Sequence, residues 1–247
     1  MVLHAITGLT HRGCKRSNNQ DSIYYHSLGK RVSLLVVADG MGGYKGGEVA
    51  SQVCVDSFQQ PFERLIEQQQ NWHAEQCHQF LAAALAAANA SILTMRSLDA
   101  NLAKMGTTCV AALVVGEKAY IVSVGDSRAY IMRDDKLQQL TTDDTLYSQL
   151  DMAQQEKLSD SPLNNILTNA IGVKAKVELQ SYELDVAPGQ VLLLASDGLT
   201  GELADDEILE IMKKSSRFDH ICDELLESCL SAIAKDNVSI ITFKVDK

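Results

Sequence analysis

Residues 36–51 read VVADGMGGYKGGEVAS, a stretch that joins the end of an apolar run to a glycine-rich turn and the start of a helical pattern. The apolar residues before Asp39 predict a buried strand, because a strand covered on both faces reads as a continuous hydrophobic run. A carboxylate at the tip of such a strand is held near the rim of the core, where an unpaired charge is costly. We therefore expect a cation to meet Asp39.

The same arrangement recurs along the chain. VLLLASDG places Asp197 after a second apolar run, VGDSR places Asp126 in a turn, and KDN places Asp236 just before a last apolar run. One aspartate before a glycine is ordinarily a turn residue, but four carboxylates at strand ends and turns favour a shared site. Oxygen ligands without histidine or cysteine select hard cations, so the pattern predicts Mg²⁺ or Mn²⁺ rather than zinc. Gly40 permits close backbone approach, so its carbonyl oxygen is a further candidate ligand.

Composition limits the classes of function. The 247 residues have 46% hydrophobic content and a formal net charge of −10, which suits one compact enzyme-sized domain and disfavours nucleic-acid partners. The six cysteines are scattered and form no CxxC pair, which is typical of a reducing cytoplasm. The apolar stretches are strand-sized, so we expect no membrane span and no export signal.

Apolar and β-branched runs predict an α+β fold dominated by strands. The expected strands lie at 3–10, 32–38, 107–115, 118–124, 127–133, 177–186, 190–195 and 238–245. Helical patterns occupy 46–62 and 71–98, with Pro61 marking the gap between them, and recur at 205–214 and 218–234. Tight turns between successive strands favour mostly antiparallel sheets, and therefore a β-sandwich flanked by helices.

A polar, weakly helical segment at 141–172 interrupts this strand rhythm. Segments of this kind commonly cover a site, so we predict a flap there. The chain has no low-complexity linker and no repeat of fixed period. We therefore predict a single domain, 1–247, that carries the flap.

With these motifs in place, the chain resembles the metal-dependent serine/threonine protein phosphatases of type 2C, in their compact bacterial form. The matching motifs keep their order over nearly the whole chain. They are GCKRSNNQDS (13–22), VVADGMGGYKGGEVAS (36–51), MGTTCVAALV (105–114), VGDSRAYIMRDDKLQQLTTDDT (124–145), LTNAIG (167–172), LLLASDGLTGEL (192–203) and DNVSIITFKV (236–245).

The resemblance implies a central sandwich of two antiparallel sheets, with a binuclear metal centre in a cleft at one end. By position in the motifs, Asp39 is similar to the carboxylate that bridges both metals, and Gly40 to the backbone-carbonyl ligand. Asp197 and Asp236 correspond to further ligands of the first metal. Asp126 resembles the residue that, with Asp197, holds a third metal in bacterial members.

The resemblance also implies two supporting roles. Asp21 matches the acid that orders metal-bound water, and Arg16 falls where the family places the guanidinium that binds the substrate phosphate. An arginine fork can make two charged hydrogen bonds to a phosphate dianion. Two close cations can activate a shared water for direct attack on phosphorus, so Arg16 and Asp39 are the predicted catalytic residues and no protein nucleophile is needed.

The implied function is hydrolysis of phosphoserine and phosphothreonine in proteins, using Mg²⁺ or Mn²⁺. We expect a monomer in the bacterial cytoplasm that opposes a serine/threonine kinase and acts on the targets of that kinase. Two other functions stay open. One is a catalytically silent phosphoprotein-binding module, against which the intact Asp39, Asp197 and Asp236 argue. The other is a metal-dependent hydrolase of small phosphate esters.

Two positions depart from the family pattern. Gln20 makes the triplet NQD instead of the more usual NED, which should change the local charge modestly and leave the metal ligands intact. Tyr44 stands where many relatives have histidine, so a histidine proton donor at that position is excluded for this chain. Protonation of the leaving group then falls to metal-bound water or to another group.

Overall fold

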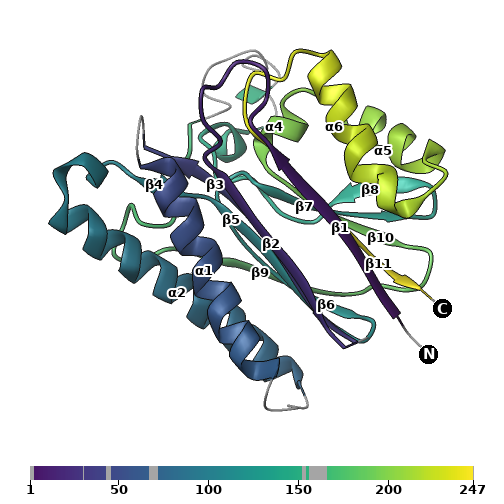
Figure 1. Ribbon diagram of the computed structural model, residues 1–247, viewed down its shortest axis with the longest axis horizontal. Coiled ribbons are helices and arrows are strands. Elements are labelled where there is room, and N and C mark those ends of the chain that lie inside the picture. The colour runs from purple at the N-terminus through teal and green to yellow at the C-terminus, as the bar shows by residue number, and fades with distance from the viewer. Residues whose placement is uncertain are drawn as a thin grey trace.

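Two stacked antiparallel sheets form the centre of the computed structural model, which describes residues 3–29, 31–42, 46–66, 72–151, 154–155 and 166–246 (Figure 1). The first sheet has the strand order β1-β11-β10-β7-β8. Its strands are β1 (Leu3–His11), β11 (Val238–Asp246), β10 (Val191–Ala195), β7 (Arg128–Arg133) and β8 (Lys136–Gln139).

The second sheet has the order β2-β3-β5-β6-β9, with the short strand β4 also paired to β3. Its strands are β2 (Asp21–Leu28), β3 (Val32–Met41), β4 (Gly106–Thr107), β5 (Cys109–Val115), β6 (Lys118–Val124) and β9 (Gln180–Asp185). Every strand pair in both sheets is antiparallel. The predicted α+β sandwich is therefore confirmed.

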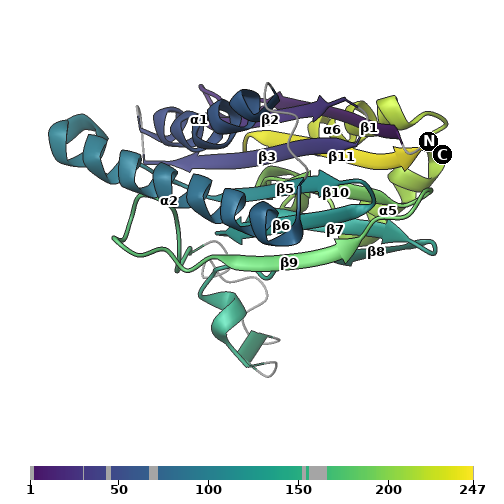
Figure 2. The same cartoon turned by 90° about the horizontal axis from the view of Figure 1, so that it is seen from below.

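Helices cover the outer face of each sheet (Figures 1 and 2). On the second sheet lie α1 (Gly47–Ile66) and α2 (Ala74–Leu98). On the first sheet lie α4 (Asp197–Thr200), α5 (Asp205–Lys214) and α6 (Ile221–Ser231). Single 3₁₀ turns occupy Ala100–Leu102, Tyr147–Gln149 and Phe218–His220.

Three apolar layers result from this arrangement, because the central strands bury both faces. The middle layer joins the sheets through residues such as Leu35, Ile131 and Phe243. The other two layers lie between each sheet and its helices. Among the described helices, α2 alone is long and apolar enough to cross a membrane. Its residues Leu81 and Ile92 are buried in the layer beneath it.

The structure corrects the predicted elements at several places: the predicted strand 107–115 is divided into β4 and β5, and β8 was not predicted. Strand β2 was not predicted, because it is a half-exposed edge strand with the mixed sequence DSIYYHSL. Strand β3 does not end at Asp39, since Gly40 and Met41 continue it by pairing with β4. Pro61 does not separate two helices but lies inside α1. An internal proline costs about 3 kcal/mol, and burial of the neighbouring Phe58 and Phe62 offsets that cost.

Candidate metal centre

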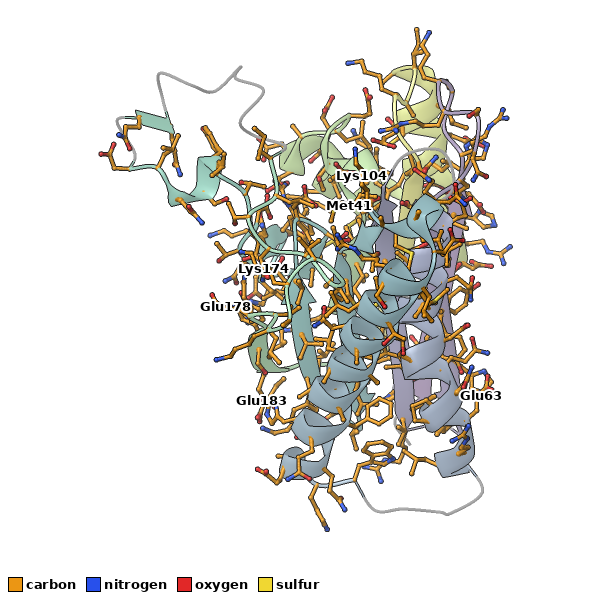
Figure 3. All side chains as sticks on the ribbon, turned by 90° about the vertical axis from the view of Figure 1, so that its left-hand side faces the viewer. Met41, Glu63, Lys104, Lys174, Glu178 and Glu183 are labelled. Carbon is orange, nitrogen blue, oxygen red and sulfur yellow. The ribbon has the colours of Figure 1, made fainter. Side chains whose placement is uncertain are left out.

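A cleft of about 700 Å³ opens at one end of the sandwich. Figure 3 labels Met41, which lines the cleft, near one end of the strands, while Glu63 and Glu183 lie toward the other end. Six of the seven predicted site residues line this cleft, and the seventh, Asp21, is the cross-strand partner of Asp39. The six are Arg16, Asp39, Gly40, Asp126, Asp197 and Asp236.

Hydrogen bonds to its backbone hold Asp39 in place. Its N–H donates to Thr108 Oγ1 at 3.1 Å, and its carbonyl oxygen accepts from Thr107 Oγ1 at 2.8 Å and from the Thr108 N–H at 2.9 Å. These bonds fix the backbone that carries the carboxylate. Next to it, Gly40 packs so closely on the start of α1 that a Cβ atom would lie 2.0 Å from the Gly47 carbonyl oxygen. Only glycine fits there.

Asp197 is the first residue of α4, which follows β10 directly. A Cβ atom on Gly198 would lie 1.9 Å from the Asn237 carbonyl oxygen, so glycine lets α4 rest against the start of β11. This close approach brings Asp197 beside Asp236. The Asp236 carboxylate accepts a hydrogen bond from Arg16 Nη2 at 2.5 Å. Arg16 therefore reaches the cleft, although its side chain is 52% exposed.

Asp126 lies in the turn between β6 and β7, as predicted. Gly125 begins this turn with a φ of +97°, and a Cβ atom there would lie 2.7 Å from Thr108. On the other side of Asp126, Ser127 Oγ lies 2.7 Å from Thr108 Oγ1. Thr108 thus links the turn of Asp126 to the backbone of Asp39.

Asp21 is buried behind the cleft, with 7% of its surface exposed. Its Oδ2 accepts hydrogen bonds from Ser196 Oγ at 2.8 Å and Ser239 Oγ at 2.6 Å. Its Oδ1 is buried and, among the described residues, has no hydrogen-bond partner. Asp197 Oδ1 is in the same situation. Buried acceptors without a donor are costly, so both oxygens fit a cation or a water held by one.

Burial raises the pKa of the carboxyl groups in the cleft, and neighbouring carboxylates add to the rise. Burial raises the pKa of Asp21 to about 6, against its two serine hydrogen bonds, and the charges of Asp197 and Asp236 add to the rise. Burial and the charges of Asp197 and Asp143 raise the pKa of Asp126 to about 7. Burial also raises the pKa of Asp39 well above its usual range, with further contributions from Asp21 and Asp197. For the Asp197 carboxyl the direction is the same, again chiefly through burial.

These residues fit hard metal ions in the chemistry of their donors, since every donor is an oxygen. In the described part of the chain, no three histidine, cysteine, aspartate or glutamate side chains already surround one point as a metal site. Asp236, one of the predicted ligands, pairs with Arg16 instead. The predicted set is therefore gathered in one cleft without forming a closed cage.

The structure adds residues that the sequence did not single out. Asn237 is buried and holds the loop that carries Arg16, because its Nδ2 donates to the carbonyl oxygens of Arg12 and Asn18 at 2.9 Å each. Its position next to Asp236 was the one available signal. Leu167, from the predicted flap, also lines the cleft. Tyr44 and part of the flap, residues 152–153 and 156–165, lie outside the described residues.

Comparison with known proteins decides the family. The family model described as protein phosphatase 2C matches residues 7–239. The chain belongs to the protein phosphatase 2C family. It is a protein-serine/threonine phosphatase, as the names of its relatives and structural neighbours agree.

Several relatives cover nearly all of this type 2C phosphatase. The serine/threonine phosphatase Stp of Listeria innocua is 31% identical over 239 residues, which cover 94% of this chain and 92% of the relative. The serine/threonine phosphatase of S. agalactiae superposes with a TM-score of 0.89 at 28% identity, covering 98% of this chain and all of the other. The catalytic domain of PstP, solved with two manganese ions, gives a TM-score of 0.83 at 30% identity with full coverage of both chains.

Proposed function

We propose that this phosphatase hydrolyses phosphoserine and phosphothreonine in proteins with two Mg²⁺ or Mn²⁺ ions bound in the cleft. Asp39 would bridge them, the Gly40 carbonyl oxygen would ligate one, and Asp197 and Asp236 would complete the other. The observation that carries the proposal is the convergence of four aspartates on one cleft, with buried acceptor oxygens on Asp21 and Asp197. A phosphatase structure with two manganese ions at 30% identity supports the number of ions.

When bound, the ions would supply an activated water for attack on phosphorus and offset the charge that develops on the phosphoryl oxygens. The chain's own residues position the reactants. Asp21 is held at Oδ2 by two serines, so its Oδ1 is fixed to accept a hydrogen bond from a water in the cleft. Asp126, with Asp197, is the proposed holder of a third ion.

Arg16 is the proposed phosphate-binding group. Its guanidinium already reaches a carboxylate oxygen in the cleft, so it can reach a phosphate oxygen there. Because a phosphate dianion carries more charge than Asp236, it competes well for the same donor. Thr108 is unsuited as a nucleophile, since its hydroxyl is engaged by Asp39 and Ser127. Attack by water is therefore favoured over attack by a protein side chain.

We also propose a setting for the enzyme. It would act in the bacterial cytoplasm as a monomer and reverse the action of a serine/threonine kinase on phosphoprotein targets. The bacterial origin of its relatives, which are named serine/threonine phosphatases, supports this setting.

The test measures hydrolysis of p-nitrophenyl phosphate and of a phosphothreonine peptide. Activity should vanish with EDTA and return with Mn²⁺ or Mg²⁺, because an oxygen-only site loses its ions to the chelator. Asp197→Asn is the matched inactive control. Full activity in EDTA, or turnover in Asp197→Asn above about a tenth of wild type, would rule out the proposed centre.

A further inference from the structure

Asp144 is a carboxylate that only neutral donors satisfy. Its Oδ2 accepts from the Gly125 N–H and from Asn169 Nδ2, both at 2.9 Å, and its Oδ1 accepts from Gln180 Nε2 at 2.8 Å. No lysine or arginine among the described residues forms an ion pair with it. None of these three partners is a predicted metal ligand, so the metal centre does not account for these bonds.

The first consequence concerns the turn that carries Asp126. Asp144 binds the Gly125 residue at both polar backbone atoms, since the Asp144 N–H also donates to the Gly125 carbonyl oxygen at 2.9 Å. The opposite side of the turn rests on Thr108. Gly125 has a left-handed backbone conformation that residues other than glycine rarely adopt. The contacts with Asp144 and Thr108 therefore fix the position at which Asp126 enters the cleft.

The second consequence concerns the cleft wall. The Asp144 carbonyl oxygen accepts from the Thr168 N–H at 2.8 Å, and the Leu146 N–H donates to the Ile166 carbonyl oxygen at 2.9 Å. The two ends of the predicted flap are thus paired where they leave the sandwich (Figure 2). Leu167 is one of the paired residues, opposite Thr145, and it lines the cleft. Asp144 therefore joins a residue that a substrate would touch to the turn of Asp126.

We propose that Asp144 is a positioning residue, which sets the affinity of the cation site at Asp126 and holds the turn of Asp126 to the cleft wall around Leu167. This inference rests on the proposed function, because it takes Asp126 as a ligand of the third ion. A carboxylate is required at position 144 because three donors converge on two acceptor oxygens. An asparagine there would turn its own donor toward at least one of them.

The first experiment compares Asp144→Asn with wild type in two measurements that do not depend on turnover. Calorimetric titration with Mn²⁺ should show the weakest site weakened about tenfold, with the two tighter sites unchanged, because the Gly125 N–H then donates to a neutral amide oxygen instead of a carboxylate. Hydrogen exchange in the metal-free protein should show the Gly125 amide exchanging about tenfold faster. Turnover should fall at low Mn²⁺ and recover at high Mn²⁺, with the KM for p-nitrophenyl phosphate unchanged.

Asn89→Ala is the matched control. Asn89 is a similar buried anchor, which accepts from the Gly172 N–H at 2.7 Å and donates to the carbonyl oxygens of Lys174 and Ala175. It touches no residue of the Gly125 turn in these bonds. Its replacement should lower the melting temperature without changing the Mn²⁺ titration. If Asp144→Asn does not fold, Asn169→Ala removes one donor to Asp144 and should shift the weakest site in the same direction.

Three outcomes would overturn the inference. They are a wild-type protein that binds no third Mn²⁺, an Asp144→Asn titration that coincides with wild type, and equal weakening of all sites in Asp144→Asn and Asn89→Ala. The proposed function fails separately, through wild-type protein that releases no phosphate with Mn²⁺ present.

Discussion

Two groups of acidic side chains, the first of them Asp143 alone and the second a set of four aspartates, lie at the cleft end of the molecule. They differ in whether the chain itself supplies a cation to pair with them. Asp143 has its own cation: Arg128 Nε donates to both of its carboxylate oxygens at 3.0 Å, and Arg128 Nη2 donates to Oδ2 at 2.7 Å. Arg128 also donates to the Tyr130 hydroxyl. Burial alone would lower the pKa of Arg128, but its bonds to Asp143 raise the pKa overall.

The second group, Asp21, Asp39, Asp126 and Asp197, has no such partner among the described residues. Its pKa values rise instead, and two of its buried oxygens lack a donor. A carboxylate kept for structure would have its oxygens satisfied within the chain, by a cation as in Asp143 or by neutral donors as in Asp144. The difference indicates that the second group is arranged for ligands from outside the chain, at a cost to the stability of the protein alone.

The largest expected effect tests this contrast directly. Asp39→Asn should lower kcat about a thousandfold or more, a loss of about 4 kcal/mol in barrier lowering, because the proposed bridge between the ions is gone. Its melting temperature in EDTA should stay equal to or above that of wild type, since one repelled carboxylate is removed. Steady-state kinetics and thermal melts measure the two effects.

Asp143→Asn is the matched variant from the other group. It should lose about 1–3 kcal/mol of unfolding free energy, because Arg128 is largely buried and keeps its charge without a partner. Its kcat should stay within about fivefold of wild type. The contrast breaks if Asp39→Asn is the less stable variant in EDTA, or if Asp143→Asn is the less active one.

The second expected effect is a pH dependence of opposite sign with and without metal. The unfolded chain has aspartate pKa values near 3.9, whereas Asp21 and Asp126 titrate at about 6 and 7 in the folded protein. The folded state therefore binds more protons between about pH 4 and 7, so this contribution is complete below pH 4 and is lost as the pH rises. In EDTA the melting temperature should fall between pH 5 and pH 8.

Metal binding needs ionised ligands, so the increase in melting temperature caused by Mn²⁺ should grow over the same interval. The exposed carboxyls with lowered pKa, such as Glu183 and Asp219, act only below about pH 4.5. Burial lowers the pKa of His4, which adds stability as the pH rises and so opposes part of the fall. Thermal melts at pH 5 and pH 8, with EDTA or with Mn²⁺, measure both changes in melting temperature. A melting temperature in EDTA that rises with pH would show that the acids are compensated within the chain.

The third prediction concerns Arg16, which differs from Arg128 in being mostly exposed and bound to one carboxylate oxygen. Arg16→Ala should raise KM more than it lowers kcat, because a phosphate dianion is present in both the ground state and the transition state. A charged hydrogen bond contributes about 1.5–3 kcal/mol, so kcat/KM should fall about ten- to a hundredfold. An unchanged KM with kcat lost would mean that Arg16 acts on the transition state alone.

The sequence was sufficient for the parts of the centre that local chemistry specifies. Asp39–Gly40 and Asp197–Gly198 each need a glycine for close backbone approach, and that requirement is visible as a motif. The α+β sandwich followed from strand-sized apolar runs joined by tight turns. The roles of the seven site residues came from the family resemblance and stay predictions.

Long-range pairing could not be derived in the same way. The register that sets Asp21 opposite Asp39 depends on β2, an edge strand without an apolar pattern. The pairing of Arg16 with Asp236 joins residues 220 positions apart. Asp144 lies in a quoted motif, yet its three donors come from separate segments. Such contacts are set by packing of the whole chain, which no local pattern contains.

The smallest expected effect adds an acid at the edge of the second group. Gln20 Nε2 donates to Glu48 Oε2 at 2.9 Å. The Gln20 carbonyl oxygen accepts hydrogen bonds from the Gly40 N–H and the Ser51 hydroxyl. Gln20→Glu keeps those backbone bonds but replaces a donor to Glu48 by a like charge. Glu48 is partly exposed, so water screens the repulsion and we expect a loss of about 0.5–1 kcal/mol of unfolding free energy in EDTA. With Mn²⁺ present the loss should shrink, because the cations offset the added charge, and kcat should stay within about threefold of wild type.

Gln52→Glu on the exposed face of α1, where Gln52 donates to Asp56, is the matched control, since it creates the same kind of like-charge pair away from the cleft. Equal responses of the two variants to Mn²⁺ would show that position 20 does not sense the ions, and a thousandfold fall in kcat for Gln20→Glu would place Gln20 among the residues that the reaction requires.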